Sequence, residues 1–81
     1  MEIAELVARL DRAKPVEELP GPEVCKQLRE QAGVTRQLAA SVLGVSDSTL
    51  ALWECGEHAP RLRHERRWRC LVSALRSTAG V

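Results

Sequence analysis

Phenylalanine and tyrosine are absent from this chain of 81 residues, and its only aromatic residues are two tryptophans. A hydrophobic core built without them has to consist mostly of leucine, valine and alanine around the two indole rings. No stretch alternates apolar and polar residues, which is the pattern of a half-buried strand. Residues that favour helices dominate instead, so the sequence predicts an all-α fold.

Long apolar runs are also lacking, since none approaches the ~20 residues that a membrane-spanning helix needs. The N-terminal segment MEIAELVARLDRAK is amphipathic and mixed in charge. A signal peptide, by contrast, begins with basic residues and continues with apolar ones. We therefore expect a cytoplasmic protein that has no membrane partner.

The three cysteines, Cys25, Cys55 and Cys70, form no CxxC pair, and an odd number argues against a disulfide framework. We expect these small thiols to fill space in the core. Cys55, His58, His64 and Cys70 follow the pattern C-x2-H-x5-H-x5-C. Structural zinc sites usually take their ligands as two close pairs from converging turns. No second pair exists here, so we expect neither a metal nor another cofactor.

Prolines and glycines divide the chain into three parts. Residues 1–13 fit an amphipathic helix, whose apolar stripe consists of Ile3, Leu6, Val7 and Leu10. Residues 14–21 are a proline-rich linker, and residues 22–77 are the main domain. The apolar stripe of the first helix needs a partner. It either supplies contacts in a dimer or folds back on the core of its own chain, and the sequence leaves both open.

Four more helices are predicted in the main domain, at residues 22–32, 36–43, 47–55 and 62–77. Pro22 suits the first turn of the first of these, where its missing amide costs nothing. We expect that helix to bury Val24, Cys25, Leu28 and Ala32. Thr35 suits the N-cap of the next helix. In the last helix, Trp68 shares one face with Leu71, Val72 and Leu75, which predicts that its ring is in the core.

The segment TRQLAASVLGVSDSTLALWECG, residues 35–56, contains two short helical patterns that meet at a glycine. Gly44 suits the left-handed conformation that ends one helix and redirects the chain. Ser46 stands where the next helix needs an N-cap. Two helices joined by a short turn that contains glycine describe a helix-turn-helix, here at residues 36–55. The second helix of this motif, the recognition helix, lies in the major groove of DNA.

Residues 26–60, KQLREQAGVTRQLAASVLGVSDSTLALWECGEHAP, resemble the helix-turn-helix family of phage repressors of the Cro and C1 type. The matching pieces are LRE at 28–30, AGVT at 32–35, LGVS at 43–46 and WECG at 53–56, followed by Pro60. The resemblance covers residues 23–75 and implies a five-helix domain of the lambda-repressor type that binds DNA. The N-terminal helix and linker further resemble short regulators of phages and mobile elements in high-GC actinobacteria.

The resemblance implies structural roles for six residues: Arg29, Ala40, Gly44, Leu50, Trp53 and Glu54. A small residue at Ala40 lets the two helices of the motif cross closely. Leu50 and Trp53 fix the recognition helix on the core. In the family, the arginine of LRE pairs with the glutamate of WExG, so Arg29 is expected to pair with Glu54.

The resemblance also implies an outward face of the recognition helix, formed by Ser46, Asp47, Ser48, Thr49, Ala51 and Leu52. None of these is Arg, Lys, Asn or Gln, the strongest readers of base edges. Ser48 and Thr49 can donate to a phosphate or a base edge, and Ala51 or Leu52 can touch a thymine methyl group. Asp47 can accept from N4 of cytosine, or it is only a helix-start charge that the helix dipole favours.

Basic residues concentrate in the part that contains the motif. Residues 1–23 carry six acids and three bases, whereas residues 24–81 carry five acids and nine bases, a balance of +4. The stretch RLRHERRWR, residues 61–69, has five arginines, which suits salt-dependent binding of phosphates. Such a stretch can equally be a solvated helix face. We expect phosphate contacts from Arg36, Gln37, Arg61 and Arg63.

No nucleophile, base and orienting group stand together, so neither an enzyme nor a small-molecule substrate is indicated. The leading hypothesis is a sequence-specific transcriptional regulator of the repressor or Cro kind. It would bind an inverted repeat of double-stranded DNA as a homodimer. The alternative is a protein-interaction module of the same fold, antitoxin-like or an anti-repressor, with weak or no specific DNA binding.

Overall fold

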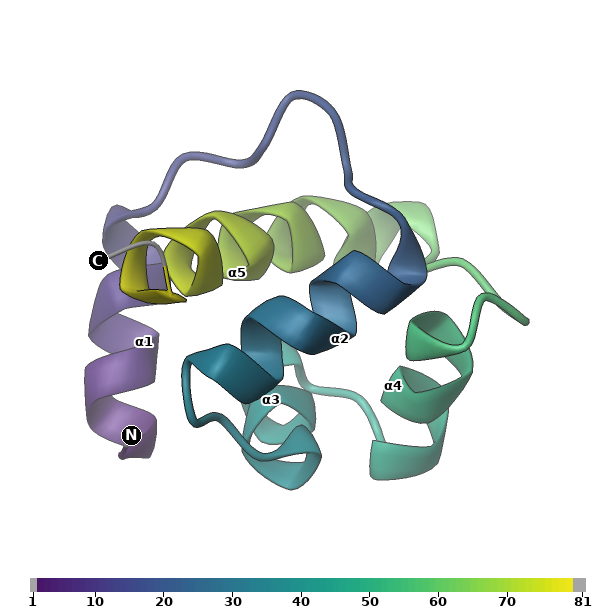
Figure 1. Cartoon of the computed structure of the whole chain (residues 1–81), viewed down its shortest axis with the longest axis horizontal. Coiled ribbons are helices and arrows are strands. Elements are labelled where there is room, and N and C mark those ends of the chain that lie inside the picture. Colours follow the sequence, from purple (N-terminus) through teal and green to yellow (C-terminus); the bar gives the residue numbers. More distant parts are fainter. Residues whose placement is uncertain (1, 80–81) are drawn as a thin grey trace.

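The computed structural model describes residues 2–79, which contain five helices and no strand (Figure 1). The helices are α1 (Ile3–Arg12), α2 (Pro22–Gln31), α3 (Arg36–Leu43), α4 (Asp47–Glu54) and α5 (Leu62–Ala79). The long α5 runs across the molecule, with α1 beside its C-terminal half and α2 in front of it. The helices α3 and α4 lie on the opposite side of α2 from α5 in this view. The predicted all-α fold with five helices is confirmed.

Local signals start and stop the two helices of the motif as predicted. The hydroxyl of Thr35 accepts a hydrogen bond from the backbone N–H of Leu38 at 3.1 Å. The hydroxyl of Ser46 accepts one from the N–H of Thr49, also at 3.1 Å. Gly44 ends α3 with φ 74°, in the left-handed region. A residue with a Cβ is strained there, so glycine allows the sharp change of direction before α4.

The core lies between α5 and the other four helices and is built from aliphatic residues around the two indoles. Leu50 of α4 and Leu71 of α5 are completely buried. The rings of Trp53 and Trp68 are 5.9 Å apart and tilted by 55°. Trp68 is 2% exposed, as its position on the apolar face of α5 predicts. Each fully buried leucine contributes roughly 1.5–3 kcal/mol relative to an exposed one.

The first helix folds back on the core of its own chain, one of the two arrangements that the sequence left open. Leu6 and Leu10 are buried, and α1 packs against α5 and α3. Nη1 of Arg9 donates a hydrogen bond to Oγ1 of Thr78 at 2.9 Å. Ile3, which was expected on the buried stripe, is half exposed. It belongs to the first turn of α1, and the buried residues of this helix lie in its later turns.

The segment between α1 and α2 lies over α5 (Figure 1), where Arg69 holds it. Nη1 of Arg69 donates to the carbonyl oxygens of Val16 and Glu17, at 3.1 and 2.7 Å. The N–H of Val16 donates in turn to the carbonyl of Arg69 at 3.3 Å. Val16 and Leu19 also pack against the core. The linker, residues 14–21, is therefore held against α5, and we call it the strap.

Two further expectations about burial are wrong. Val24 of α2 is 46% exposed, because the buried row of this helix runs through Cys25 and Arg29, and Val24 lies about 100° away from it. Among the thiols only Cys25 is buried; Cys70 is half-buried and Cys55 is exposed. Cys55 is the residue after the last turn of α4, where the chain leaves the core.

Candidate nucleic-acid interface

A buried ion pair fixes the C-terminal end of α4. Nε and Nη2 of Arg29 donate to the two carboxylate oxygens of Glu54, at 2.6 and 3.0 Å. Nη1 of Arg29 donates to the carbonyl oxygen of Val34 at 2.8 Å. The side chains of Arg29 and Glu54 are only 8% and 4% exposed. The pair that the resemblance implied is thus present, and it joins α2, the turn after it and the recognition helix α4.

The face of α4 opposite the core points outward. Leu50 is fully buried and Trp53 is 6% exposed, so both attach α4 to the core. Ala40, which is 3% exposed, lies on α3 among the buried residues of that helix. The six base-contact candidates all retain exposed surface: Ser46, Ser48 and Leu52 are exposed, and Asp47, Thr49 and Ala51 are half-buried.

Two of the hydroxyl candidates already have partners in the first turn of α4. Ser46 caps the backbone of Thr49, and their hydroxyl oxygens lie 2.8 Å apart in a further hydrogen bond. Ser48 is exposed beside them. The Ser46 and Thr49 hydroxyls therefore stabilise the start of α4, and Ser48 has the most accessible hydroxyl of the three.

Arg36 and Asp47 form an exposed ion pair at the N-terminal end of α4. Nε and Nη2 of Arg36 donate to Oδ1 and Oδ2 of Asp47, at 2.9 and 3.1 Å. The side chains are 45% and 40% exposed. The hydrogen bonds from Arg36 hold the pKa of Asp47 below its ordinary value, and Asp47 raises the pKa of Arg36. Both groups are therefore charged at neutral pH.

From the sequence, Arg36 was expected to contact a phosphate, and Asp47 to contact a base or only to interact with the helix dipole. Their pairing with each other was not expected. A signal for it exists. The two residues are the first of α3 and of α4, and a tight turn joins these helices. Two neighbouring helix starts with side chains of opposite charge are candidates for a pair. Gln37, the second residue of α3, is exposed next to Arg36.

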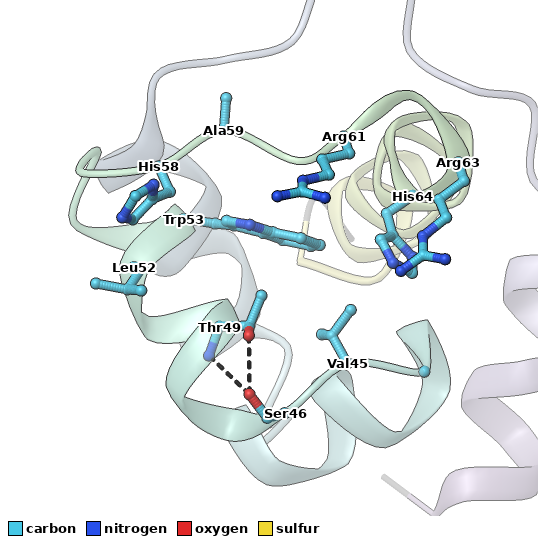
Figure 2. Close-up of a pocket in the computed structure, with 11 residues that line it drawn as sticks. Val45, Ser46, Thr49, Leu52, Trp53, His58, Ala59, Arg61, Arg63 and His64 are labelled. Carbon is cyan, nitrogen blue, oxygen red and sulfur yellow. Dashed lines mark hydrogen bonds between the residues drawn. The ribbon is translucent and has the colours of Figure 1, made fainter.

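A cleft of about 430 Å³ lies on one side of α4, between this helix and the start of α5 (Figure 2). Arg61, Arg63 and His64 stand on one wall, Ser46 and Thr49 on the other, and the indole of Trp53 lies between them. Arg61 and Arg63 are exposed, and neither takes part in an ion pair within residues 2–79. Their charges can therefore meet an anionic ligand.

A second cleft of about 660 Å³ lies on the other side of α4, toward α2. Arg36 and Lys26 line it together with two acidic residues, Glu23 and Glu54. Leu52 lines both clefts. The recognition helix is thus a ridge with basic side chains in the hollow on either side. This is the arrangement that a helix needs to enter a groove between two phosphate backbones.

The arginines of residues 61–69 divide into three groups. Nε of Arg67 donates to the carbonyl oxygen of Val42 at 2.9 Å, near the C-terminus of α3, and Arg69 holds the strap. Arg61 and Arg63 line the cleft, and Arg66 is exposed elsewhere on α5. Composition alone could not separate these uses, because they depend on which element faces each turn of α5.

The four residues considered for zinc do not form a cluster. Within the described part of the chain, no group of three or more His, Cys, Asp and Glu side chains is placed to hold a metal ion. His58 and His64 both line the cleft beside α4. Between residues 2 and 79, no helix combines the length and the apolar composition that crossing a membrane requires.

Fold and surface together define a helix-turn-helix domain of the class that binds DNA. Comparison with known families agrees, because residues 26–64 match the family described as Helix-turn-helix. These residues extend from α2 to the first turn of α5 and contain a helix-turn-helix of the Cro/C1 type, the motif of a family of DNA-binding regulators. Neither the curated proteins nor the solved structures contain a match to this chain.

Proposed function

We propose that this protein is a transcriptional regulator that recognises a specific double-stranded DNA sequence with α4 in the major groove. The observation that carries the proposal is the ridge formed by α4, which has a cleft with exposed basic side chains on each side, Arg61 and Arg63 on one and Lys26 and Arg36 on the other. Arg36 and Gln37 would contact one phosphate backbone, and Arg61 and Arg63 the other. The outward face of α4 would meet the base edges between them; it consists of Ser46, Asp47, Ser48, Thr49, Ala51 and Leu52.

The proposed regulator binds an inverted repeat as a homodimer and represses the adjacent promoter. Half-sites of such repeats lie about 34–36 Å apart, so one recognition helix of each copy enters the groove on the same side of the duplex. The Cα extents of one copy are 29 × 24 × 22 Å, which suits two copies side by side at this spacing. Because Leu6 and Leu10 are buried within the chain, dimer contacts would come from surfaces other than their stripe.

The test is selection of bound duplexes from a random DNA library at about 0.15 M salt. We expect an enriched motif with two-fold symmetry. Replacing Arg61 and Arg63 by alanine should abolish enrichment, whereas Arg66→Ala, an exposed arginine outside the cleft, should leave the motif unchanged. Sedimentation at tens of micromolar checks the dimer separately, and a monomer both with and without the enriched duplex would contradict it.

One observation favours a second candidate function, a protein-interaction module that has lost specific DNA binding. Residues 46–52 include none of Arg, Lys, Asn and Gln, so the base-facing side chains form few strong contacts. A library selection without any enriched motif, with all binding lost at 0.15 M salt, would support this function over the first. Substituting Arg36 and Arg61 by alanine should then leave partner binding intact.

A further inference from the structure

The outward face of α4 has a single charged side chain, that of Asp47. Its two carboxylate oxygens each accept one hydrogen bond from Arg36, and 40% of the side chain stays exposed. A carboxylate oxygen accepts up to two hydrogen bonds, so each oxygen retains capacity for a second donor. Asp47 is therefore oriented by one partner and still open to another.

An ionised carboxylate only accepts hydrogen bonds, which restricts the base edges that it tolerates. In the major groove, guanine presents the acceptors N7 and O6, and thymine presents the acceptor O4. Adenine offers its N6 amino group but places the acceptor N7 beside it. Cytosine offers the donor N4 with no acceptor of its own next to it. Among the four bases, cytosine suits Asp47 best.

Arg36 gives this contact its geometry. Its two parallel hydrogen bonds, of 2.9 and 3.1 Å, fix the plane of the Asp47 carboxylate. The guanidinium charge also offsets the carboxylate charge, which would otherwise be repelled by the phosphates of the groove. Nη1 of Arg36 takes no part in the two hydrogen bonds to Asp47. It can therefore donate to a phosphate while Nε and Nη2 hold the carboxylate.

We propose that Asp47 is the specificity-determining residue of this protein and selects a cytosine in each half-site, with Arg36 as the residue that positions it. This inference rests on the proposed function, since it assumes that α4 enters the major groove. It makes the exposed ion pair a coupled unit, in which one arginine links the phosphate contact to the base contact. The serines, Thr49 and the apolar residues of the face then add only shape and weak contacts.

The experiment is the library selection repeated with the Asp47→Asn variant next to the unchanged protein. Asparagine reads adenine through its N6 and N7 atoms. We expect one cytosine per half-site in the wild-type motif, and adenine at the same position with Asp47→Asn. Competition between the two duplexes should show a preference of about tenfold or more in each direction. Arg61→Ala is the matched control: it should weaken binding to all duplexes and keep the cytosine preference.

A second variant, Arg36→Lys, separates positioning from simple attraction to phosphate. Lysine keeps the charge but cannot form the fork, so the cytosine preference should fall more than the overall affinity does. An equal loss on all duplexes would overturn the role of Arg36. Thermal unfolding of every variant establishes that it is folded, which the exposure of both side chains leads us to expect.

The outcomes distinguish a failure of the proposed function from a failure of the inference about Asp47. If the wild-type protein enriches no motif, the proposed function itself fails. If it enriches a motif that Asp47→Asn leaves unchanged, the DNA-binding function stands and the inference about Asp47 is wrong. A wild-type motif with no cytosine in its half-sites would overturn the inference in the same way.

Discussion

An arginine–carboxylate ion pair lies at each end of α4, and one pair is buried while the other is exposed. At the C-terminal end, Arg29 and Glu54 form a two-bonded ion pair that is almost fully buried. At the N-terminal end, Arg36 and Asp47 form a pair of the same geometry that is nearly half exposed. Burial decides what each pair does. A buried charge cannot lose its partner without a large penalty, whereas an exposed one exchanges its partner for water or a ligand.

The largest expected effect comes from breaking the buried pair. Arg29→Ala leaves the carboxylate of Glu54 buried without a partner and should lower the free energy of unfolding by about 3–5 kcal/mol. Because a small domain has a total of only about 5–15 kcal/mol, this variant should unfold at a much lower urea concentration. Urea unfolding followed by tryptophan fluorescence measures it. Arg36→Ala is the control and should leave the unfolding midpoint nearly unchanged.

The double substitution Arg29→Met with Glu54→Met sharpens the first result. It removes both charges together, so it should destabilise the protein less than the sum of the two single substitutions. Urea midpoints of the four proteins give the coupling energy between the two residues. A coupling close to zero would show that the buried pair does not hold α4 in place.

The labelling rates of the cysteine thiols test the same difference between the buried and the exposed ion pair. Cys25 is buried on α2, four residues before Arg29, and burial raises the pKa of its thiol. Cys55, next to Glu54, is exposed. We expect a thiol reagent to label Cys55 first and Cys25 only when the core opens. Arg29→Ala should speed the labelling of Cys25 but not that of Cys55, and Arg36→Ala should alter neither rate.

The exposed pair should matter for DNA instead of stability. Arg36→Ala removes one phosphate contact, so the slope of log K against log salt should become shallower by about 1. Binding at several salt concentrations, measured by fluorescence anisotropy on the selected duplex, tests this. An unchanged slope would mean that Asp47 already neutralises Arg36 in the complex and that no phosphate is contacted there.

The smallest effect is the pH dependence of the exposed pair. The pKa of Asp47 is lower in the folded protein than in the unfolded chain, where it is ordinary. Its contribution to stability is therefore fully present above the unfolded pKa, about 4, and is lost as the pH falls through the folded pKa. An NMR titration of the Asp47 carboxyl carbon follows this group directly. In Arg36→Ala its midpoint should move upward, toward the ordinary value.

The parts of this molecule that depend on adjacent residues could be predicted from the sequence. Thr35 and Ser46 cap their helices, and Gly44 turns the chain, because each acts within three or four residues of its own position. The pairing of Arg29 with Glu54 was accessible only through the family resemblance. Nothing in the spacing of two residues 25 positions apart indicates a contact.

What could not be predicted depends on the angles between helices. Their positions at two helix starts make Arg36 and Asp47 candidates for a pair, but the pair forms only if the N-terminal ends of α3 and α4 lie close together. The different roles of Arg63 and Arg67 follow from what lies opposite each turn of α5, a cleft in one case and the end of α3 in the other. Val24 was placed on the correct helix but on the wrong side of its buried row.

The contact between the first and last helices has a consequence for how the protein is made. Arg9 and Thr78 are 69 positions apart, yet they are hydrogen-bonded, and Leu6 and Leu10 bury their side chains in a core shared with α5. At about 5–20 residues per second, α1 is synthesised several seconds before α5 is complete. During that time its apolar stripe lacks the part of the core that α5 supplies. Of the five helices, the one that is translated first is therefore among the last to be packed.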